Sequence, residues 1–267
     1  METQDSDRVR DQVRTAYAAV ARGAGGCSVG CCGTEGAGSL AMGYTKEDLE
    51  SAPDGADLGL GCGNPHAIAA LQPGETVLDL GSGAGFDCFL AAKRVGRTGR
   101  VIGIDMTPDM IAMARDNARR VEATNVDFRL GEIEHLPAPD ASVDVVLSNC
   151  VINLSPDKAS VFKEAFRVLR PGGRLAISDV VATKDMPREL AENVAALTGC
   201  VSGAAKLSVL RALLSEAGFD DVKIEPRPES RAIISNCMPG TEDYVVSATI
   251  EGRKPGGKSC CGPTCCA

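Results

Sequence analysis

Along most of the chain, short apolar runs typical of buried strands alternate with longer segments whose apolar residues recur at helical spacing. The short runs predict strands at residues 76–80, 101–105, 126–130, 143–148, 174–179, 222–226, 232–235 and 244–250. The longer segments predict helices at residues 86–95, 108–122, 158–169, 187–197 and 207–217. This alternation indicates an α/β fold with a mostly parallel sheet, in which ligands bind beyond the carboxyl ends of the strands.

The segments outside this alternation have other patterns. Residues 5–22 predict an amphipathic helix, residues 23–38 a glycine-rich loop and residues 66–71 a short helix. Thr45 and Asp48 have the spacing of a helix cap. We expect four parts: an N-terminal helix and cysteine-containing loop (1–60), a Rossmann-like domain (61–180), a small α+β extension (181–252) and a flexible cysteine-rich tail (253–267).

Composition narrows the class of protein. At 267 residues and 44% apolar content, the chain is long enough for one sizeable domain with an appendage. Its formal charge of −8 argues against a nucleic-acid surface, which needs a basic patch. No apolar run approaches the roughly 20 residues of a membrane span, and the first residues lack the apolar core of a signal peptide. We therefore expect a cytoplasmic protein without nucleic-acid or membrane partners.

The segment Thr76–Gly85 is the most informative part of the chain. It reads as a buried strand that ends in a glycine-rich turn, and a helix follows at once. A second strand ends at Asp105, about twenty residues after the glycines, as in a nucleotide-binding half-fold. Asp79 directly precedes the turn, where it would repel a pyrophosphate but suit a ligand with a cationic amino-acid end. The turn resembles the cofactor loop of class I S-adenosylmethionine-dependent methyltransferases, and this combination favours that methyl donor over a dehydrogenase dinucleotide.

Twelve cysteines are unusual in a protein expected in a reducing compartment, where structural disulfides are rare. Several lie in loops rather than in apolar runs, so packing does not account for them. They do not show the paired Cys-x₂-Cys spacing of a zinc ribbon. The cysteines occupy positions 27, 31, 32, 62, 88, 150, 200, 237, 260, 261, 265 and 266.

Four segments resemble motifs of the arsenite S-adenosylmethionine methyltransferase family. They are the glycine-cysteine-glycine loop at 60–65, the turn at 105–107, the segment 149–157 after the fourth strand and the cysteine loop at 199–203. The resemblance runs from about residue 30 to about residue 250. It implies a class I methyltransferase sheet, a donor-binding domain at 61–180 and an arsenic-binding contribution from 181–252.

The resemblance also implies the site residues. Cys62, Cys150 and Cys200 would bind trivalent arsenic and carry the reaction, together with an N-terminal cysteine that is either Cys31 or Cys32. We favour Cys32. The methyl donor would be bound by residues at four strand ends: Asp79, Gly81, Ser82, Gly83, Asp105, Met106, Glu132, Ile133 and Asn149.

The chemistry of arsenic agrees with this assignment. Trivalent arsenic is a soft centre that thiolates suit as ligands, and its lone pair is the nucleophile, so no general base is needed. Catalysis would rest mainly on proximity and in-line orientation. Methyl transfer oxidises arsenic, and two nearby thiolates would reduce it again by forming a disulfide that thioredoxin or glutathione then clears. Arsenite–thiol complexes would be the substrate.

Other residues have simpler interpretations. Cys88 is expected to be a small buried residue, and Cys237 a structural or incidental one. His135 is expected at the surface, and His66 at the start of a helix without a catalytic role.

Two rival functions share part of this sequence pattern. A small-molecule C- or O-methyltransferase on the same fold would not need Cys62, Cys150 and Cys200. A non-enzymatic thiol protein that sequesters soft metalloids would not need Asp79 or Asp105. The presence of both sets favours the enzyme. The number of methyl transfers, the preference between arsenite and antimonite, and the oligomeric state stay open.

Four cysteines lie within the seven residues Cys260–Cys266, behind a glycine-rich stretch. A flexible tether raises the local concentration of a ligand without shaping the reacting geometry. We therefore expect deletion of residues 258–267 to leave the maximal rate nearly intact but to weaken capture at low arsenite. Steady-state kinetics over a wide arsenite range, with excess thiol, tests this. A collapse of the saturated rate would place the tail in the active site instead.

Overall fold

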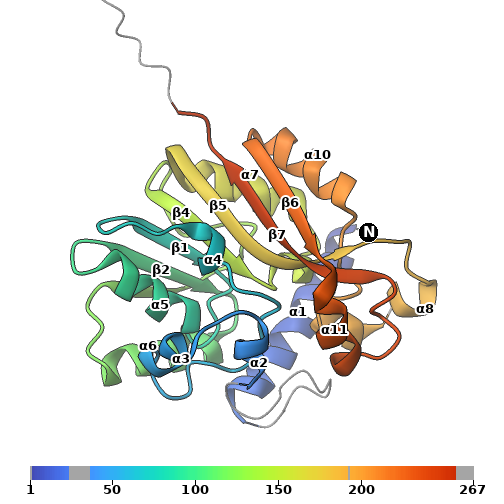
Figure 1. The fold of residues 1–267 in the computed structure, drawn as a ribbon, viewed down its shortest axis with the longest axis horizontal. Helices are drawn as coiled ribbons and strands as arrows, with labels where there is room; N and C mark the ends of the chain where they lie inside the picture. Colours follow the sequence, from blue (N-terminus) through green and yellow to red (C-terminus); the bar gives the residue numbers. More distant parts are fainter. Residues whose placement is uncertain (1, 24–36, 192, 257–267) are drawn as a thin grey trace, which may run out of the picture.

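The computed structural model describes residues 2–23, 37–191 and 193–256 and has the expected α/β architecture. The strands are β1 (Thr76–Leu80), β2 (Arg100–Asp105), β3 (Val126–Leu130), β4 (Val143–Asn149), β5 (Leu169–Ala182), β6 (Asp220–Arg227) and β7 (Val245–Arg253). They form a single sheet in the order β3-β2-β1-β4-β5-β7-β6. Figure 1 shows this sheet crossing the molecule.

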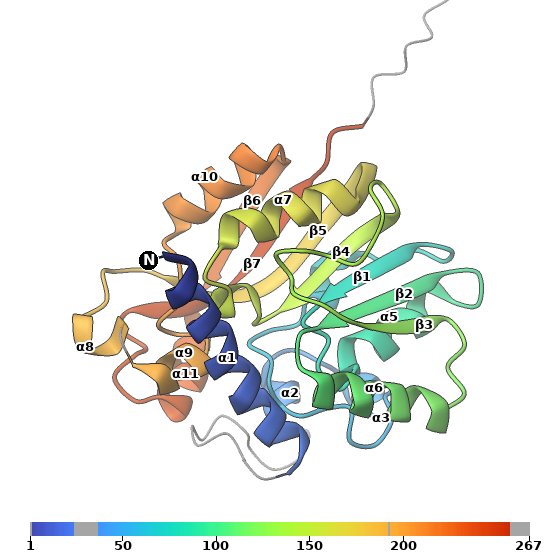
Figure 2. The same ribbon diagram turned by 180° about the vertical axis from the view of Figure 1, so that it is seen from behind.

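Helices cover both faces of the sheet, as the opposite views of Figures 1 and 2 show. The helices are α1 (Glu2–Ala21), α2 (Ala37–Ala41), α3 (Lys46–Ser51), α4 (His66–Ala69), α5 (Phe86–Val95), α6 (Pro108–Arg120), α7 (Lys158–Val168), α8 (Arg188–Ala191), α9 (Val194–Thr198), α10 (Leu207–Ala217) and α11 (Arg231–Cys237), with 3₁₀ turns η1 (Ile152–Leu154) and η2 (Pro228–Ser230). In the described residues, none of them is both long and apolar enough to cross a bilayer.

The sheet has a large apolar core on each of its two faces. Helices α7 and α10 pack on one face, where Leu78 and Leu80 of β1 point. Helices α4, α5 and α6 pack on the other face, where Val77 points. This alternation follows from the two-residue period of a strand. Because both faces are covered, the parallel strands are apolar on both sides, as the short runs in the sequence predicted.

The strand pairing places the turns after β1, β2, β4 and β5 at one edge. Strand β1 pairs in parallel with β2 and β4, β2 with β3, and β4 with β5. The predicted late strands at 222–226 and 244–250 are confirmed as β6 and β7. However, β7 inserts between β5 and β6 and runs antiparallel to both, an arrangement that the sequence pattern did not predict.

The strand predicted at 232–235 is wrong, because these residues belong to α11. A short apolar run does not distinguish a strand from one buried side of a helix. Here Ile234 is buried while Ala232 is exposed, so the run presents one helical side to the core. The 3₁₀ turn η2 leads directly into α11, which favours continuation as a helix.

Other boundaries also differ from the predictions, three of them by more than a few residues or by a change of element. The helix predicted at 187–197 is two short helices, α8 and α9, and the side chain of Asn193 accepts a hydrogen bond from Ala196 N at 3.1 Å, as a residue at a helix start does. The fifth strand is longer than predicted, because Leu169 already pairs with Val143. Helix α2 lies partly within the predicted loop 23–38.

The N-terminal helix is confirmed as α1 and lies against α6 and α9. Arg22, directly after α1, pairs with Asp109 of α6 at 3.1 Å, and Tyr17 OH donates to Thr198 O at 3.3 Å. The predicted cap at Thr45 is also confirmed, with reciprocal hydrogen bonds of 3.0 Å to Asp48. The N-terminal segment is therefore attached to the carboxyl edge of the sheet.

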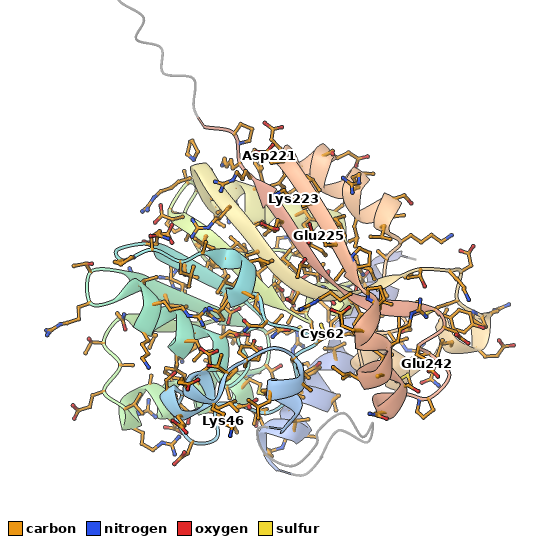
Figure 3. All side chains as sticks on the ribbon, in the orientation of Figure 1. Lys46, Cys62, Asp221, Lys223, Glu225 and Glu242 are labelled. Atoms are coloured by element: carbon orange, nitrogen blue, oxygen red, sulfur yellow. The ribbon has the colours of Figure 1, made fainter. Side chains whose placement is uncertain are left out.

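Strand β6 forms one edge of the sheet and carries exposed charged side chains along it. Figure 3 marks Asp221, Lys223 and Glu225 there. Exposed charges on an edge strand oppose pairing with another chain. Near the start of the predicted tail, Lys254 N donates to Gly173 O at 2.8 Å. Residues 257–267 lie outside the described residues.

The close packing between β2 and α5 generates a stability prediction. A Cβ at Gly103 would lie 2.6 Å from the Phe128 ring and 2.8 Å from Cys88 Sγ, both buried. We expect Gly103→Ala to lower the free energy of unfolding by about 1–3 kcal/mol, measured by denaturant titration. Gly256→Ala, with nothing within 4 Å of the added Cβ, is the control and should change it by less than about 0.5 kcal/mol. If Gly103→Ala were as stable as the unsubstituted protein, the close contact of Gly103 with Phe128 and Cys88 would be contradicted.

Candidate active site

A cavity opens at the carboxyl edge of the sheet. The turns after β1, β2 and β4 form one side of it, and residues of α1, α2 and the segment 56–61 form the other. Parallel strands deliver their carboxyl ends to this edge, which is where α/β folds bind ligands.

The glycine turn after β1 brings backbone rather than side chains to this cavity. Gly81 has φ +67°, and a Cβ there would lie 2.3 Å from Val151 of the turn after β4. Only glycine fits such an approach. Asp105 at the end of β2 accepts hydrogen bonds from Gly83 N at 3.0 Å and Thr107 N at 2.8 Å, so its carboxylate is fixed beside the turn.

Five carboxylates line the cavity: Asp57, Asp79, Asp87, Asp105 and Glu134. Burial raises the pKa of Asp79 well above its usual range, and the nearby charges of Asp87 and Asp105 raise it further. The thiol of Cys88 opposes this by donating to Asp79 Oδ2 at 3.3 Å. The neighbouring carboxylates of Asp79, Asp87 and Asp105 favour a cationic ligand, whose charge relieves their repulsion.

A hydrogen-bond network connects the acids to the loop that carries Cys62. Tyr44 OH donates to Asp87 Oδ1 at 2.6 Å, and Asn149 Nδ2 donates to Tyr44 OH at 2.9 Å. The same amide donates to Gly63 O at 2.9 Å and accepts from Cys62 N at 3.1 Å. The end of β4 thereby joins the cavity wall to the Cys62 loop.

Three thiols that lie far apart in the sequence meet next to the cavity. Cys150 and Cys200 belong to one buried cluster, the half-buried Cys62 packs against it, and Cys150 also lines the cavity. Cys62 Sγ, Cys150 Sγ and a carboxylate oxygen of Asp179 lie within 4.8 Å of one another. Cys200 Sγ donates to Cys150 O at 2.8 Å. Figure 3 marks Cys62 near the middle of the view, and its Sγ lies 3.6 Å from Ser178 O of β5.

Two of these cysteines have an unfavourable backbone conformation. Cys150 has φ +57° and Cys200 has φ +62°, a left-handed region that residues with a Cβ rarely adopt. Such a conformation costs about 1–3 kcal/mol and concentrates at functional sites. Cys150 is held by the hydrogen bond from its N to Ser178 O at 2.8 Å, and Cys200 by the bond from its N to Leu197 O at 2.9 Å.

Burial keeps the three thiols protonated at neutral pH. It raises the pKa of Cys62 to about 12, with smaller contributions from Asp179 and Cys200. The pKa of Cys200 is raised by its hydrogen bond to Cys150 and by burial. For Cys150, the bond from Cys200 favours the thiolate, but Cys62 and burial outweigh it, and the pKa is raised. The thiol cluster is therefore neutral, apart from Asp179.

Known proteins resemble this chain in sequence and in fold. A family model for a methyltransferase domain matches residues 71–226. The arsenite methyltransferase of Halobacterium salinarum is 54% identical over 94% of this chain and 68% of its own length. The mouse arsenite methyltransferase is 32% identical over 93% of this chain and 68% of its own length. The solved arsenic(III) S-adenosylmethionine methyltransferase of Chlamydomonas reinhardtii is 34% identical and covers 85% of this chain and 76% of its own, with a TM-score of 0.62.

This chain belongs to the arsenite methyltransferase family. Membership confirms the resemblance found in the sequence and the class of enzyme. It also argues against a protein that only sequesters metalloids. As a member of a methyltransferase family, the chain uses S-adenosylmethionine as its methyl donor.

The structure gathers most of the residues predicted for an arsenite methyltransferase site. All predicted donor-binding residues except Glu132 line the cavity: Asp79, Gly81, Ser82, Gly83, Asp105, Met106, Ile133 and Asn149. Glu132 instead pairs with Arg14 of α1 at 3.3 Å, while its neighbour Glu134 lines the cavity. Cys31, Cys32 and the side chain of Cys237 lie outside the described part of the structure.

Sequence reasoning missed several residues of this arsenite methyltransferase site. Asp87 had a usable signal, since it is an acid in the first turn of the helix that follows the glycine turn. Tyr44 and Asp179 lie in no motif that we interpreted. The predicted positions of three other residues are confirmed: Cys88 is buried, His135 is exposed and His66 starts α4. The side chain of His66 is buried, with Nε2 3.1 Å from Asp87 Oδ1.

Proposed function

We propose that Cys62, Cys150 and Cys200 hold trivalent arsenic as a tris-thiolate while the adjoining cavity holds S-adenosylmethionine, so that the methyl group passes directly to arsenic. The observation that carries this proposal is the position of Cys150. It belongs to the thiol cluster and also lines the cavity. A ligand in the cavity and a centre bound to Cys150 are therefore neighbours, and proximity is the main requirement for this reaction.

The cavity residues fit the methyl donor. Asp105 would accept the ribose hydroxyls, and Asp79 and Asp87 would face the cationic amino-acid end. Met106 and Ile133 offer apolar contact to adenine. When bound, S-adenosylmethionine supplies a methyl group on a cationic sulfonium to the lone pair of arsenic. Among the described residues no histidine lines the cavity, and this chemistry needs no general base.

The neutral thiols suit loading with arsenite. Each thiol that replaces a hydroxide on arsenic forms an As–S bond, and its proton leaves with the hydroxide as water. Exchange from an arsenite–thiol complex balances in the same way, since the proton goes to the departing thiolate. The raised pKa values of Cys62, Cys150 and Cys200 therefore do not oppose binding, and the product is a neutral complex suited to a buried site.

Methyl transfer leaves arsenic formally pentavalent. Two of its sulfur ligands would then join as a disulfide, and the electron pair released would return arsenic to the trivalent state. Thioredoxin or glutathione would supply the two electrons and two protons that restore the thiols. The short distance between Cys62 and Cys150 supports such a step, because disulfide formation requires sulfurs that approach closely.

Asp105 provides a test of the donor site. Its two carboxylate oxygens would bind both ribose hydroxyls, so Asp105→Ala should cost about 2 kcal/mol of binding free energy. This corresponds to roughly 30-fold weaker affinity for S-adenosylmethionine, measured by calorimetric titration. Asp220→Ala, at an exposed position of β6, is the control. Unchanged affinity in Asp105→Ala, with the protein still folded, would reject the assignment.

The thiols provide a second test. Two thiolates are the minimum that holds a methylated arsenic, so Cys150→Ser and Cys200→Ser should each abolish methylation of both arsenite and a monomethylated trivalent substrate. Cys62→Ser should affect arsenite more, since that substrate has room for a third sulfur. Product speciation after incubation with methyl donor and thiol measures this.

Cys88→Ser is the matched control for the thiol variants. Cys88 is buried but lies outside the cluster, and a serine hydroxyl keeps a donor toward Asp79. This variant should retain activity on both substrates. Full activity in Cys150→Ser would show that arsenic binds elsewhere.

A further inference from the structure

A buried carboxylate lies beside the thiol cluster and has no part in the function proposed above. Asp179, near the end of β5, is 2% exposed. One of its oxygens lies within 4.8 Å of both Cys62 Sγ and Cys150 Sγ. Apolar side chains, Leu154 and Val180 among them, pack around these sulfurs. Burying an acid is costly, and the positive charge of Lys158 offsets part of that cost. The position of the carboxylate beside two sulfurs points to a further positive charge, on a centre that these sulfurs bind.

The hydrogen bonds of Asp179 fit an ionised side chain. Its oxygens accept from Ile152 N at 3.0 Å, Asn153 Nδ2 at 2.9 Å and Val180 N at 2.7 Å. All three partners are donors, and an ionised carboxylate only accepts. The same bonds fix the direction of the carboxylate, because two of them come from the 3₁₀ turn η1 that follows Cys150.

We propose that Asp179 stabilises the positive charge that methyl transfer places on arsenic. This inference rests on the proposed function. Before the transfer, arsenic with three thiolate ligands is neutral. The arsenic lone pair then forms the As–C bond, the C–S bond of the donor breaks, and its electron pair stays on the departing neutral thioether. The positive charge thereby moves from sulfur to arsenic, beside Asp179.

The charge distribution of the site explains why a carboxylate is needed on this side. Asp79, Asp87 and Asp105 surround the donor cavity and favour the charge in its initial position. Without Asp179, the reaction would move a positive charge away from these acids into an apolar cluster. A fixed charge placed where charge develops in the transition state lowers the barrier, and it does so more effectively in a dry site than in water.

A purely positioning role is the competing explanation. Asn153 Nδ2 donates to Asp179 and also to Cys200 O at 3.2 Å. The pair therefore ties β5 to both cysteine loops. If Asp179 acted only through this tie, its removal would displace the thiols, and arsenite affinity would fall together with the rate.

The two explanations are separated by measuring rate and affinity independently. In Asp179→Asn, we expect the single-turnover rate of methyl transfer, at saturating arsenite and donor, to fall by at least about 10-fold. Arsenite affinity, from equilibrium dialysis with elemental analysis of arsenic, should stay within about 3-fold. An unchanged rate would overturn the proposal, and so would a loss of affinity as large as the loss of rate.

Asn153→Ala is the matched control. It removes the tie between the loops but keeps the carboxylate of Asp179. We expect arsenite affinity to weaken more than the saturated rate in this variant. A pattern identical to that of Asp179→Asn would show that both residues only position the thiols, and would overturn the charge assignment.

A second charge variant covers the case in which Asp179→Asn does not fold. The positive charge of Lys158 acts on both Asp179 and Cys200. Removing it in Lys158→Gln should raise the single-turnover rate by about 2-fold or more, and a rate that does not rise would contradict the proposal. Failure of the wild-type protein to methylate arsenite would instead reject the proposed function, independently of Asp179.

Discussion

The side-chain amide of Asn149 holds together two parts of the site that differ in chemistry. Its nitrogen donates to Tyr44 OH and Gly63 O, and its oxygen accepts from Cys62 N. The first contact belongs to the acidic cavity and the other two to the thiol-bearing loop. A Cβ on Gly61 would lie 2.7 Å from this amide, so the loop packs directly against it. Without this junction, nothing in the strand pairing alone would place Cys62 beside Cys150.

The two halves of the site treat charge in opposite ways. Carboxylates surround the cavity and favour a cation there. The thiols are buried and neutral, so they favour a neutral arsenic complex. In the proposed reaction, transfer of a methyl cation between the halves requires compensation on the arsenic side, and Asp179 would provide it. Association of a neutral acceptor with a cationic donor also avoids repulsion between the two bound ligands.

The thiols converge because Cys150 and Cys200 both adopt a left-handed backbone conformation. A regular helix or strand at Cys150 or Cys200 would not have the left-handed backbone that both residues adopt. That cost is offset by surrounding hydrogen bonds, of which the Asp179–Asn153 pair supplies several. Three ligands from three separate loops can then approach one centre, which adjacent residues on a single element would not allow.

The sequence by itself determined the α/β class, the glycine turn with its two strand-end acids, and the three cysteines of the cluster. These depend on local patterns: apolar periodicity, the turn preference of glycine, and motifs of a few residues. Tertiary structure decided the strand order, the type of one element and the approach of distant side chains. It placed β7 between β5 and β6, made a helix of residues 231–237, and brought Tyr44, Asp87 and Asp179 to the site. Strand order and the approach of distant side chains depend on contacts between segments, and such contacts leave no periodic signal in either segment alone.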